Sequence, residues 1–343
     1  MGIIFAILIF SFIVFFHELG HFLLAKKNGI DVEEFAIGMG PNLISKEYKG
    51  TRYCIKILPI GGLCMMGEDE EATDSPSNFN NKSVWARISV IAAGPVFNFI
   101  LAFVFAVILT AMVGYDKPVI SNVEEGYPAY EAGIHEGDTI VRLNGKKINI
   151  FREINTYNQF NQGKETEITF LRDGEKKTVT VTPKMDEELG YYRFGIGGGA
   201  YTKANVFTAV QYGVYEVKFW ICTTVDSLKM LVTRQIGMDQ LSGPVGIVSV
   251  VDDTYQESKS YGAFVVLAQF LNIAILLSAN LGVMNLLPIP ALDGGRLLFL
   301  FVEAIRRKRI PPEKEAYVHL AGMALLMALM IFVMFNDIKR VFF

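Results

Sequence analysis

The sequence predicts an α-helical polytopic membrane protein, with about four transmembrane helices and an inserted α+β domain. Three observations support this fold class. The chain has 343 residues, is 51% hydrophobic, and has a positive mean hydropathy. Its apolar residues gather in four segments of bilayer length. Between the second and the third of these segments, strand-like runs alternate with turn signals, as in a soluble domain.

The four apolar segments define the candidate spans. They cover about residues 2–25, 88–113, 262–287 with a continuation at 297–305, and 318–335. The first segment lacks the basic start and the small-x-small cleavage site of a secretory signal. We therefore expect it to remain part of the protein.

Basic residues predict how the spans are oriented. Lysines and arginines are concentrated in residues 26–87, between the first two spans, and in residues 306–309, between the last two. Loops rich in lysine and arginine usually face the cytoplasm, so both connections are predicted to be cytoplasmic. The N-terminus and the long middle segment are then outside. Lys339 and Arg340, after the fourth span, are a minor exception.

The middle segment is predicted to contain an inserted domain. Strand-like runs at residues 138–145, 167–174 and 177–182 flank a helical stretch at 149–160. Residues 127–145, YPAYEAGIHEGDTIVRLNG, resemble bacterial PDZ domains. Such domains bind extended peptide by strand addition beside a helix, so extended peptide is an expected partner here.

These observations predict four parts in the chain. They are the N-terminal half of a membrane core (1–115), a PDZ-like domain (116–185), a linker with an amphipathic helical region (186–260), and the C-terminal half of the core (261–343). In the third part, residues 205–232 carry one apolar stripe at helical spacing, formed by Phe207, Val210, Val214, Val217 and Ile221. Such a helix lies on the outer membrane surface or packs against the core.

The first span contains the most informative motif, His17-Glu18-Leu19-Gly20-His21. Residues four apart share one helix face, so His17 and His21 can present two imidazoles to a single ion. Glu18 lies beside them as a carboxylate that can accept a proton from water. This is a zinc-hydrolase arrangement. Ionisable groups in hydrocarbon are costly and usually mark a function, which weakens the alternative of an ordinary buried histidine pair.

A catalytic zinc site needs a third protein ligand, and Asp293 is the leading candidate. It lies in the run Asn285 to Arg296, where Pro288, Pro290 and two glycines interrupt an apolar stretch. The prolines remove backbone donors, so the helix should break at membrane depth. An aspartate at such a break is well placed to meet an ion, although a solvent-facing helix cap is the competing explanation. His319, at the start of the fourth span, is expected at the membrane interface.

Together these motifs resemble the site-2 protease family of intramembrane zinc metalloproteases. They are His17 to His21, Ala93-Gly-Pro-Val-Phe-Asn98, the PDZ-like insert, Ser242-Gly-Pro-Val-Gly246, and Asn285 to Arg296, in that order. The branch that they resemble most is that of the bacterial regulator-of-sigma-E protease. The resemblance covers nearly the whole chain, but only one PDZ-like unit is found where some members have two.

The resemblance implies a zinc cofactor, with His17, His21 and Asp293 as metal ligands and Glu18 as the catalytic base. It also implies that Asn285 and Pro288 hold an unwound substrate. Residues 35–41 and 58–67 match the family's glycine loop and membrane re-entrant β-hairpin, with Gly61 and Gly62 as substrate contacts. The hairpin could pair with the unwound strand.

The expected substrates are single-pass transmembrane proteins, either anti-sigma factors or remnant signal peptides, and the expected location is the bacterial inner membrane among its lipids. Two other functional classes stay open. A metal transporter could also place His and Asp at membrane depth, but it usually has internal repeats. A catalytically inactive PDZ-bearing scaffold would not need a full set of ligands and base. The net charge of −3 gives no indication of nucleic-acid binding. The three cysteines, Cys54, Cys64 and Cys222, are expected to be free thiols.

Overall fold

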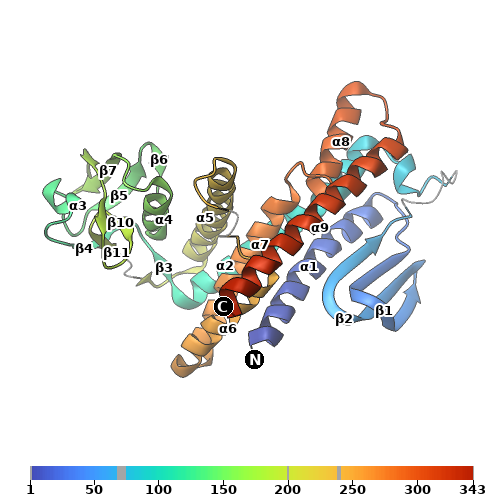
Figure 1. The fold of residues 1–343 in the computed structure, drawn as a ribbon, viewed down its shortest axis with the longest axis horizontal. Helices are drawn as coiled ribbons and strands as arrows, with labels where there is room; N and C mark the ends of the chain where they lie inside the picture. The colour runs from blue at the N-terminus through green and yellow to red at the C-terminus, as the bar shows by residue number, and fades with distance from the viewer. Residues whose placement is uncertain (1, 68–74, 199–200, 238–240, 343) are drawn as a thin grey trace. The chain divides into compact units, whose positions relative to one another are not determined.

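A computed structural model describes residues 2–67, 75–198, 201–237 and 241–342 (Figure 1). The chain divides into two compact units, which are described in turn. One consists of Met1–Ala102 together with Ile236–Phe343, and the other of Phe103–Gln235.

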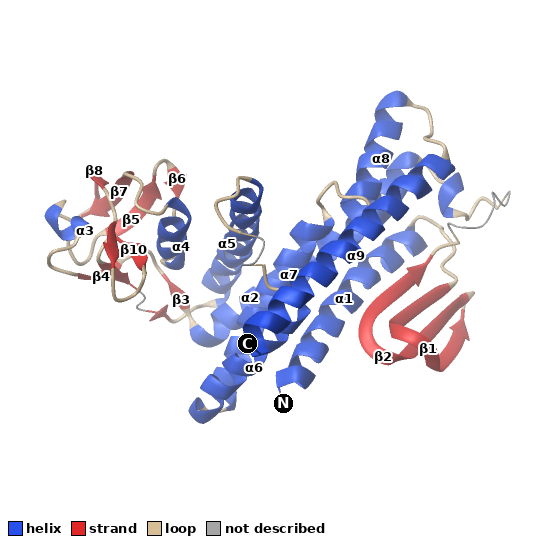
Figure 2. Ribbon diagram, viewed as in Figure 1, coloured by secondary structure: helices blue, strands red, loops and turns tan. Residues whose placement is uncertain are grey.

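The first unit is mostly helical, with one separate β-hairpin (Figure 2). Four of its helices are long and apolar enough to cross a membrane, which confirms the predicted spans. These helices are α1 (Gly2–Lys27), α2 (Val84–Val113, which continues into the second unit), α7 (Ala263–Asn285) and α9 (Pro312–Phe342). The shorter elements are β1 (Glu34–Tyr48), β2 (Thr51–Met65), η1 (Phe79–Asn81), α6 (Pro244–Ser258), η3 (Lys259–Tyr261) and α8 (Asp293–Arg306).

Small residues let α1 and α2 approach each other closely. A Cβ atom at Gly20 of α1 would clash with the backbone of Ala93 and the ring of Phe97 on α2. On the other side of α2, the Ser278 hydroxyl of α7 donates to the carbonyl of Asn98 at 2.8 Å. Lipid tails are as apolar as the helices, so close backbone packing and interhelical hydrogen bonds stabilise such a bundle.

The β-hairpin is longer than the segments that suggested it, and it folds back on itself. Phe35 of β1 pairs with two residues of β2, Tyr53 on one side and Cys64 on the other. Gly38 has a φ of 89°, where glycine is favoured. The segment 62–65 therefore has residues 34–37 along one edge. In the described part of the chain, no strand pairs with its other edge.

The chain leaves the helical conformation between α7 and α8, as the prolines predict. Helix α7 ends at Asn285 and α8 begins at Asp293. Neither Pro288 nor Pro290 has an N–H to continue the helical hydrogen bonds. We call residues 286–292 the proline loop.

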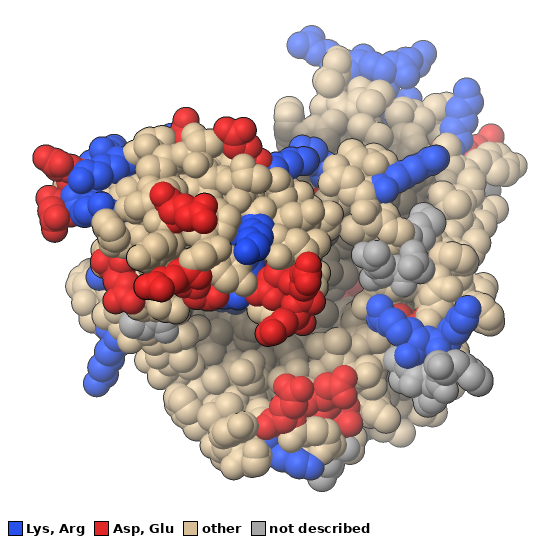
Figure 3. Space-filling model, turned by 60° about the vertical axis from the view of Figure 1, so that its left-hand side comes forward, with Lys and Arg blue, Asp and Glu red and all other residues tan. Residues whose placement is uncertain are grey.

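Polar contacts join the ends of these elements. Asp337 of α9 is buried, and its carboxylate accepts the N–H of Gly246 in the first turn of α6 at 2.8 Å. A carboxylate at a helix N-terminus is favoured by the helix dipole. Arg87 of α2 forms a largely buried ion pair with Glu303 of α8. Four exposed basic residues follow in a row at the end of α8: Arg306, which is its last residue, and then Arg307, Lys308 and Arg309. Figure 3 shows Lys and Arg side chains gathered along the upper edge of that view.

The second unit contains the inserted α+β domain. Its main sheet is antiparallel, with the strand order β6-β5-β7-β8, and β4 pairs with β11. The elements are β3 (Tyr115–Asp116), β4 (Ile120–Val123), α3 (Pro128–Glu131), β5 (Thr139–Leu143), β6 (Lys146–Lys147), α4 (Arg152–Asn161), β7 (Thr166–Arg172), β8 (Glu175–Val181), β9 (Lys184–Asp186), β10 (Tyr191–Arg193), β11 (Ile196–Gly198), β12 (Tyr201–Thr202) and α5 (Val206–Val232).

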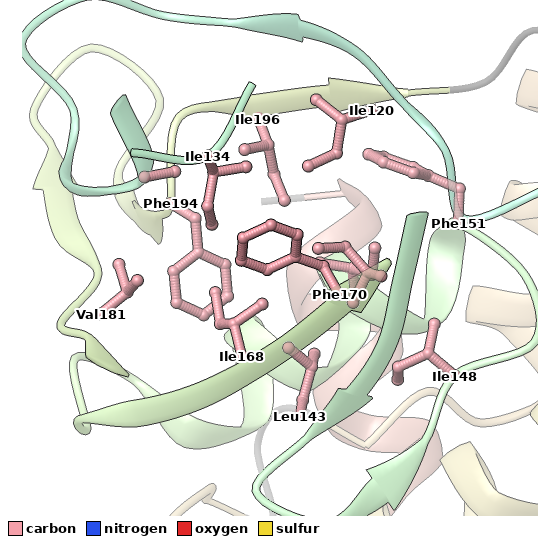
Figure 4. Packing of buried hydrophobic residues seen from close by; sticks show 13 residues of the cluster. Ile120, Ile134, Leu143, Ile148, Phe151, Ile168, Phe170, Val181, Phe194 and Ile196 are labelled. Carbon is pink, nitrogen blue, oxygen red and sulfur yellow. The ribbon is translucent and has the colours of Figure 1, made fainter. Parts of the chain in front are cut away.

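One apolar cluster forms the core of this domain (Figure 4). Ile140, Ile168 and Phe170 from the central strands are almost fully buried in it. Phe194 and Ile196 belong to the same cluster, and Ile196 lies on β11, which pairs with β4. Both residues come from the segment that forms strands β9 to β11, which the sequence pattern did not predict. This segment is therefore part of the same domain. We call residues 116–198 the PDZ-like domain.

A charged cluster secures the turn between β9 and β10. Arg193 Nη1 donates to Asp186 at 2.8 Å, and the Tyr127 hydroxyl donates to the same carboxylate at 2.7 Å. The Arg193 guanidinium and the Tyr127 hydroxyl stabilise the charged carboxylate and lower the pKa of Asp186 to about 2. The carboxylate stabilises the turn at neutral pH, and this contribution would disappear as the pH falls from about 4 to about 2.

Helix α5 confirms the helix predicted in residues 205–232. Asn205 caps it, accepting the Thr208 N–H at 2.9 Å. The face with Gly213, Glu216 and Phe219 is buried, and Glu216 forms an ion pair with Arg152 of α4. The opposite face carries Phe207, Val210 and Val214, which are exposed. The second unit therefore leaves that end of the predicted apolar stripe uncovered.

Candidate metal centre

Two imidazoles lie side by side in the helical part of the first unit. His17 and His21 lie one turn apart on α1, and their Nε2 atoms are 3.2 Å from each other. Both side chains are buried. The helical spacing alone brings them together, as the sequence predicted.

Asp293 joins the two histidines from the other end of the chain. Its Oδ2 lies 3.1 Å from His17 Nε2 and 3.4 Å from His21 Nε2. One possible ligand atom from each of the three residues lies within 4.8 Å of the other two. Asp293 is the first residue of α8, so the end of the proline loop places it here.

The backbone of α2 fixes the proton on His21. Nδ1 of His21 lies 2.9 Å from the carbonyl oxygen of Val90, which can only accept. Nδ1 must therefore carry a proton, which leaves Nε2 of the neutral ring with a free lone pair directed at Asp293. Metal-ligating histidines are usually held in this way.

Asn98 can hold His17 in the same way. Its side-chain amide is fully buried and lies 3.1 Å from Nδ1 of His17. The amide oxygen is buried without a hydrogen-bond partner. With the amide turned so that this oxygen faces His17, it accepts a hydrogen bond from the Nδ1–H group, and Nε2 of the neutral ring keeps a free lone pair.

The three groups suit a divalent cation. With both rings neutral and their protons on Nδ1, two Nε2 lone pairs and a carboxylate oxygen face one another, and Asp293 Oδ2 is buried without a hydrogen-bond partner. Such an arrangement of electron pairs is unfavourable unless a cation lies among them. Two imidazoles and a carboxylate form a known ligand set of catalytic zinc. Gly94 of α2 leaves space here, since a Cβ atom at this position would lie 2.6 Å from Cε1 of His17.

Glu18 lies beside this group but is not one of its three members. It follows His17 on α1, and a Cβ atom at Gly62 would lie 2.8 Å from its Cγ. The side chain also contacts the backbone of Cys64. Glu18 thus lies between the histidines and the segment 62–65 of the hairpin.

The other predicted site residues differ in how close they lie to the histidines and to Glu18. Asn285 is close, because its Nδ2 lies 3.4 Å from Nε2 of His17. Gly62 lies against Glu18, whereas Gly61, with a φ of 86°, lies against the side chain of Met39. Pro288 is exposed, and among the described residues no hydrogen bond joins it to the histidines.

The sequence reasoning gave no roles to Gly94 and Asn98, or to the Val90 carbonyl. Gly94 and Asn98 had been noted only as part of a motif in the second span. Their spacing of four residues places them on one face of α2, and this signal could have indicated that they act together. The Val90 contact involves the backbone and leaves no mark in the sequence.

Comparison with known proteins now identifies the family. The model of Peptidase family M50 matches residues 5–329. The chain belongs to peptidase family M50. It is 39% identical to a putative zinc metalloprotease of Clostridium acetobutylicum, over 98% of this chain and 97% of that one. It is 37% identical to the regulator of sigma-W protease RasP of Bacillus subtilis, over 98% of both chains.

A search of solved structures finds the PDZ domain of an SdrC-like protein from Listeria monocytogenes. It is 22% identical, covers 25% of this chain and 90% of that one, and has a TM-score of 0.23. The M50 membership and the zinc metalloprotease relatives make this protein a zinc-dependent endopeptidase of the membrane. They favour the protease over the transporter and the inactive scaffold.

The cradle at Gly94 leads to a first prediction. Gly94→Ala should push the imidazoles of the M50 peptidase apart, lowering zinc affinity and reducing peptidase activity by about 10²-fold. Zinc content by mass spectrometry and cleavage of a transmembrane substrate measure the two effects. Val96→Ala, at an exposed position on the same helix, is the control and should leave both quantities unchanged. Full zinc occupancy and activity in Gly94→Ala would contradict the proposed cradle.

Proposed function

We propose that His17, His21 and Asp293 hold the zinc ion and that Glu18 is the catalytic base for cleavage of transmembrane segments. The observation that carries this proposal is the convergence of Asp293 Oδ2 on two imidazole Nε2 atoms of the first span, with Glu18 adjacent. Such a group at membrane depth is costly to bury without a function.

The residues divide the chemistry between them. When bound, zinc polarises the scissile carbonyl and makes water easier to deprotonate. The Glu18 carboxylate accepts the proton of the attacking water and delivers it to the leaving nitrogen. Val90 and Asn98 hold the imidazole rings in the tautomers that leave Nε2 free.

A helical substrate must unwind before it can be cut, because its peptide bonds are shielded by internal hydrogen bonds. Among the described residues, the backbone of segment 62–65 is paired on one edge only, and it lies next to Glu18. An unwound substrate strand can add to its open edge. The amide of Asn285, near His17, can take up freed backbone groups, and Pro288 would help to hold the unwound strand.

The substrates proposed are single-pass membrane proteins. The name of the Bacillus subtilis relative, regulator of sigma-W protease, links that protein to control of a sigma factor. An anti-sigma factor or a remnant signal peptide supplies the single transmembrane segment that this site would accept.

Sequencing of cleavage products tests the catalytic assignment. Glu18→Gln should retain zinc but lose proteolysis by about 10²- to 10⁴-fold, since only the proton acceptor is removed. His17→Ala, His21→Ala and Asp293→Ala should instead lower zinc occupancy. Comparable turnover by Glu18→Gln would disprove its role as base. A fully metallated Asp293→Ala protein would mean that the third ligand lies elsewhere.

We further propose that the N-terminus and the PDZ-like domain lie outside the cytoplasm of a bacterial cell. The support is the basic segment 26–87 and the exposed basic run 306–309. Single cysteines can be placed at Lys176 and at Arg307 in a chain lacking Cys54, Cys64 and Cys222. A membrane-impermeant maleimide should label Lys176→Cys in intact cells, and Arg307→Cys only after permeabilisation. The reverse pattern would invert the topology.

We propose that the PDZ-like domain selects substrates without taking part in bond cleavage. Its groove, about 300 Å³ in volume, lies between α4 and β11 and has Asn155 and Gln159 on its helical wall. Strand β11 pairs with β4 along one edge, and an extended peptide could add along the groove.

Filling this groove separates selection from cleavage. Asn155→Trp should leave hydrolysis of a short, trimmed transmembrane substrate within about twofold of the wild type, because no candidate catalytic group lies in residues 116–198. It should change the discrimination against a substrate with an intact ectodomain. Asn155→Ser is the matched control. Loss of activity on the trimmed substrate in a folded, zinc-loaded Asn155→Trp protein would place the domain in the catalytic assembly.

A further inference from the structure

The proline loop is a problem for a protein in a membrane. It contains seven residues between α7 and α8, and two of them are prolines without an N–H. At membrane depth each remaining N–H needs a partner from the protein. The loop also ends at Asp293, so its conformation determines where that carboxylate lies.

Four of the five N–H groups in the loop bond within the loop or to the end of α7. Those of Leu286 and Leu287 donate to Val283 and Met284, and those of Ile289 and Leu292 donate to Leu287 and Ile289. The fifth, from Ala291, donates instead to a side chain of another helix. Its acceptor is Nδ1 of His319 on α9, at 3.0 Å.

This bond secures the least favourable residue of the loop. Ala291 has a φ of 74°, in the left-handed region that alanine rarely adopts. It is two residues from Asp293. A strained residue of this kind persists only when its surroundings hold it in place.

The surroundings of His319 direct its Nδ1 toward the loop. The imidazole packs on the ring of Phe299 from α8, with the ring centroids 5.7 Å apart. Its Nε2 lies 3.8 Å from a carboxylate oxygen of Glu315, one turn earlier on α9. Because Nδ1 accepts the Ala291 N–H, Nε2 is the atom that carries the proton in the neutral ring. One turn later, Gly322 lies so close to the loop that a Cβ atom there would be 2.7 Å from the carbonyl oxygen of Pro290.

We propose that His319 is a positioning residue for the third zinc ligand. Its Nδ1 accepts the Ala291 N–H and fixes the proline loop in the conformation from which Asp293 reaches His17 and His21. Helix α9 thereby takes part in metal binding, although it contributes no ligand. The inference rests on the proposed ligand set of His17, His21 and Asp293.

The test compares two substitutions that differ in one acceptor. The side-chain oxygen of asparagine can occupy the position of Nδ1, whereas leucine fills the space without accepting a hydrogen bond. In the purified full-length protein, zinc affinity is measured by competition with a fluorescent zinc chelator. His319→Leu should weaken zinc binding by about 10- to 100-fold, the range typical for partners that orient metal ligands. His319→Asn should stay within about threefold of the wild type. Tyr317→Leu, an exposed residue on the same helix, is the control and should have no effect.

If His319→Leu fails to fold, His319→Gln replaces it. Its amide is polar but lies one bond further from the backbone, so its acceptor is out of position. Equal zinc affinities in the wild type, the asparagine variant and the leucine or glutamine variant would overturn the proposal. Equal losses of zinc affinity in His319→Asn and in the leucine or glutamine variant would overturn it as well. They would show that packing matters and the hydrogen-bond acceptor does not.

A double mutant separates this inference from the ligand assignment. If His319 acts through Asp293, then His319→Leu should cause no further loss of zinc affinity in an Asp293→Ala background. A full additional loss would show that His319 acts by another route. Wild-type zinc affinity in Asp293→Ala alone would instead disprove the ligand set, which is a different result.

Discussion

The burial of three mutually facing electron-pair donors is the constraint on which the membrane unit depends. His17 Nε2, His21 Nε2 and Asp293 Oδ2 lie within hydrogen-bonding distance of each other, yet neutral rings that carry their protons on Nδ1, toward Val90 and Asn98, have none between the Nε2 atoms. A cation resolves this conflict, and zinc suits two nitrogens and one carboxylate. The apolar bundle around the site makes the need stronger, because water cannot easily replace the missing partner.

The close packing of α1 and α2 follows from that constraint. Gly20 allows the two backbones to approach, and Gly94 provides the space that the imidazole rings occupy. Val90 and Asn98, on the same helix as Gly94, supply the partners of the two rings. A single stretch of α2 thus makes room for the proposed ligands and also orients them. This is a typical division of labour around metal sites, where outer partners matter nearly as much as the ligands.

The candidate catalytic residues and the PDZ-like domain belong to separate compact units. The histidines, Glu18, Asp293 and the hairpin all lie in the first unit, whereas the groove between α4 and β11 lies in the second. If the groove selects substrates as proposed, this organisation allows selection to change without altering the proposed zinc site. Function in such proteins resides in sites, and the sites can vary independently of the fold that carries them.

Local patterns in the sequence determined much of this protein. Apolar length predicted the four spans, the i, i+4 spacing brought the two histidines together, and Pro288 and Pro290 marked the break before Asp293. Each of these signals acts within a few residues, where backbone geometry is fixed by residue type. Only the tertiary structure decided which distant groups meet. Val90 and Asn98 hold the histidines from 69 and 81 residues away, and β11 completes the sheet edge beside β4. His319 meets Ala291 from 28 residues further along the chain. Such contacts depend on how helices and strands pack in space, and no periodicity along the chain encodes them.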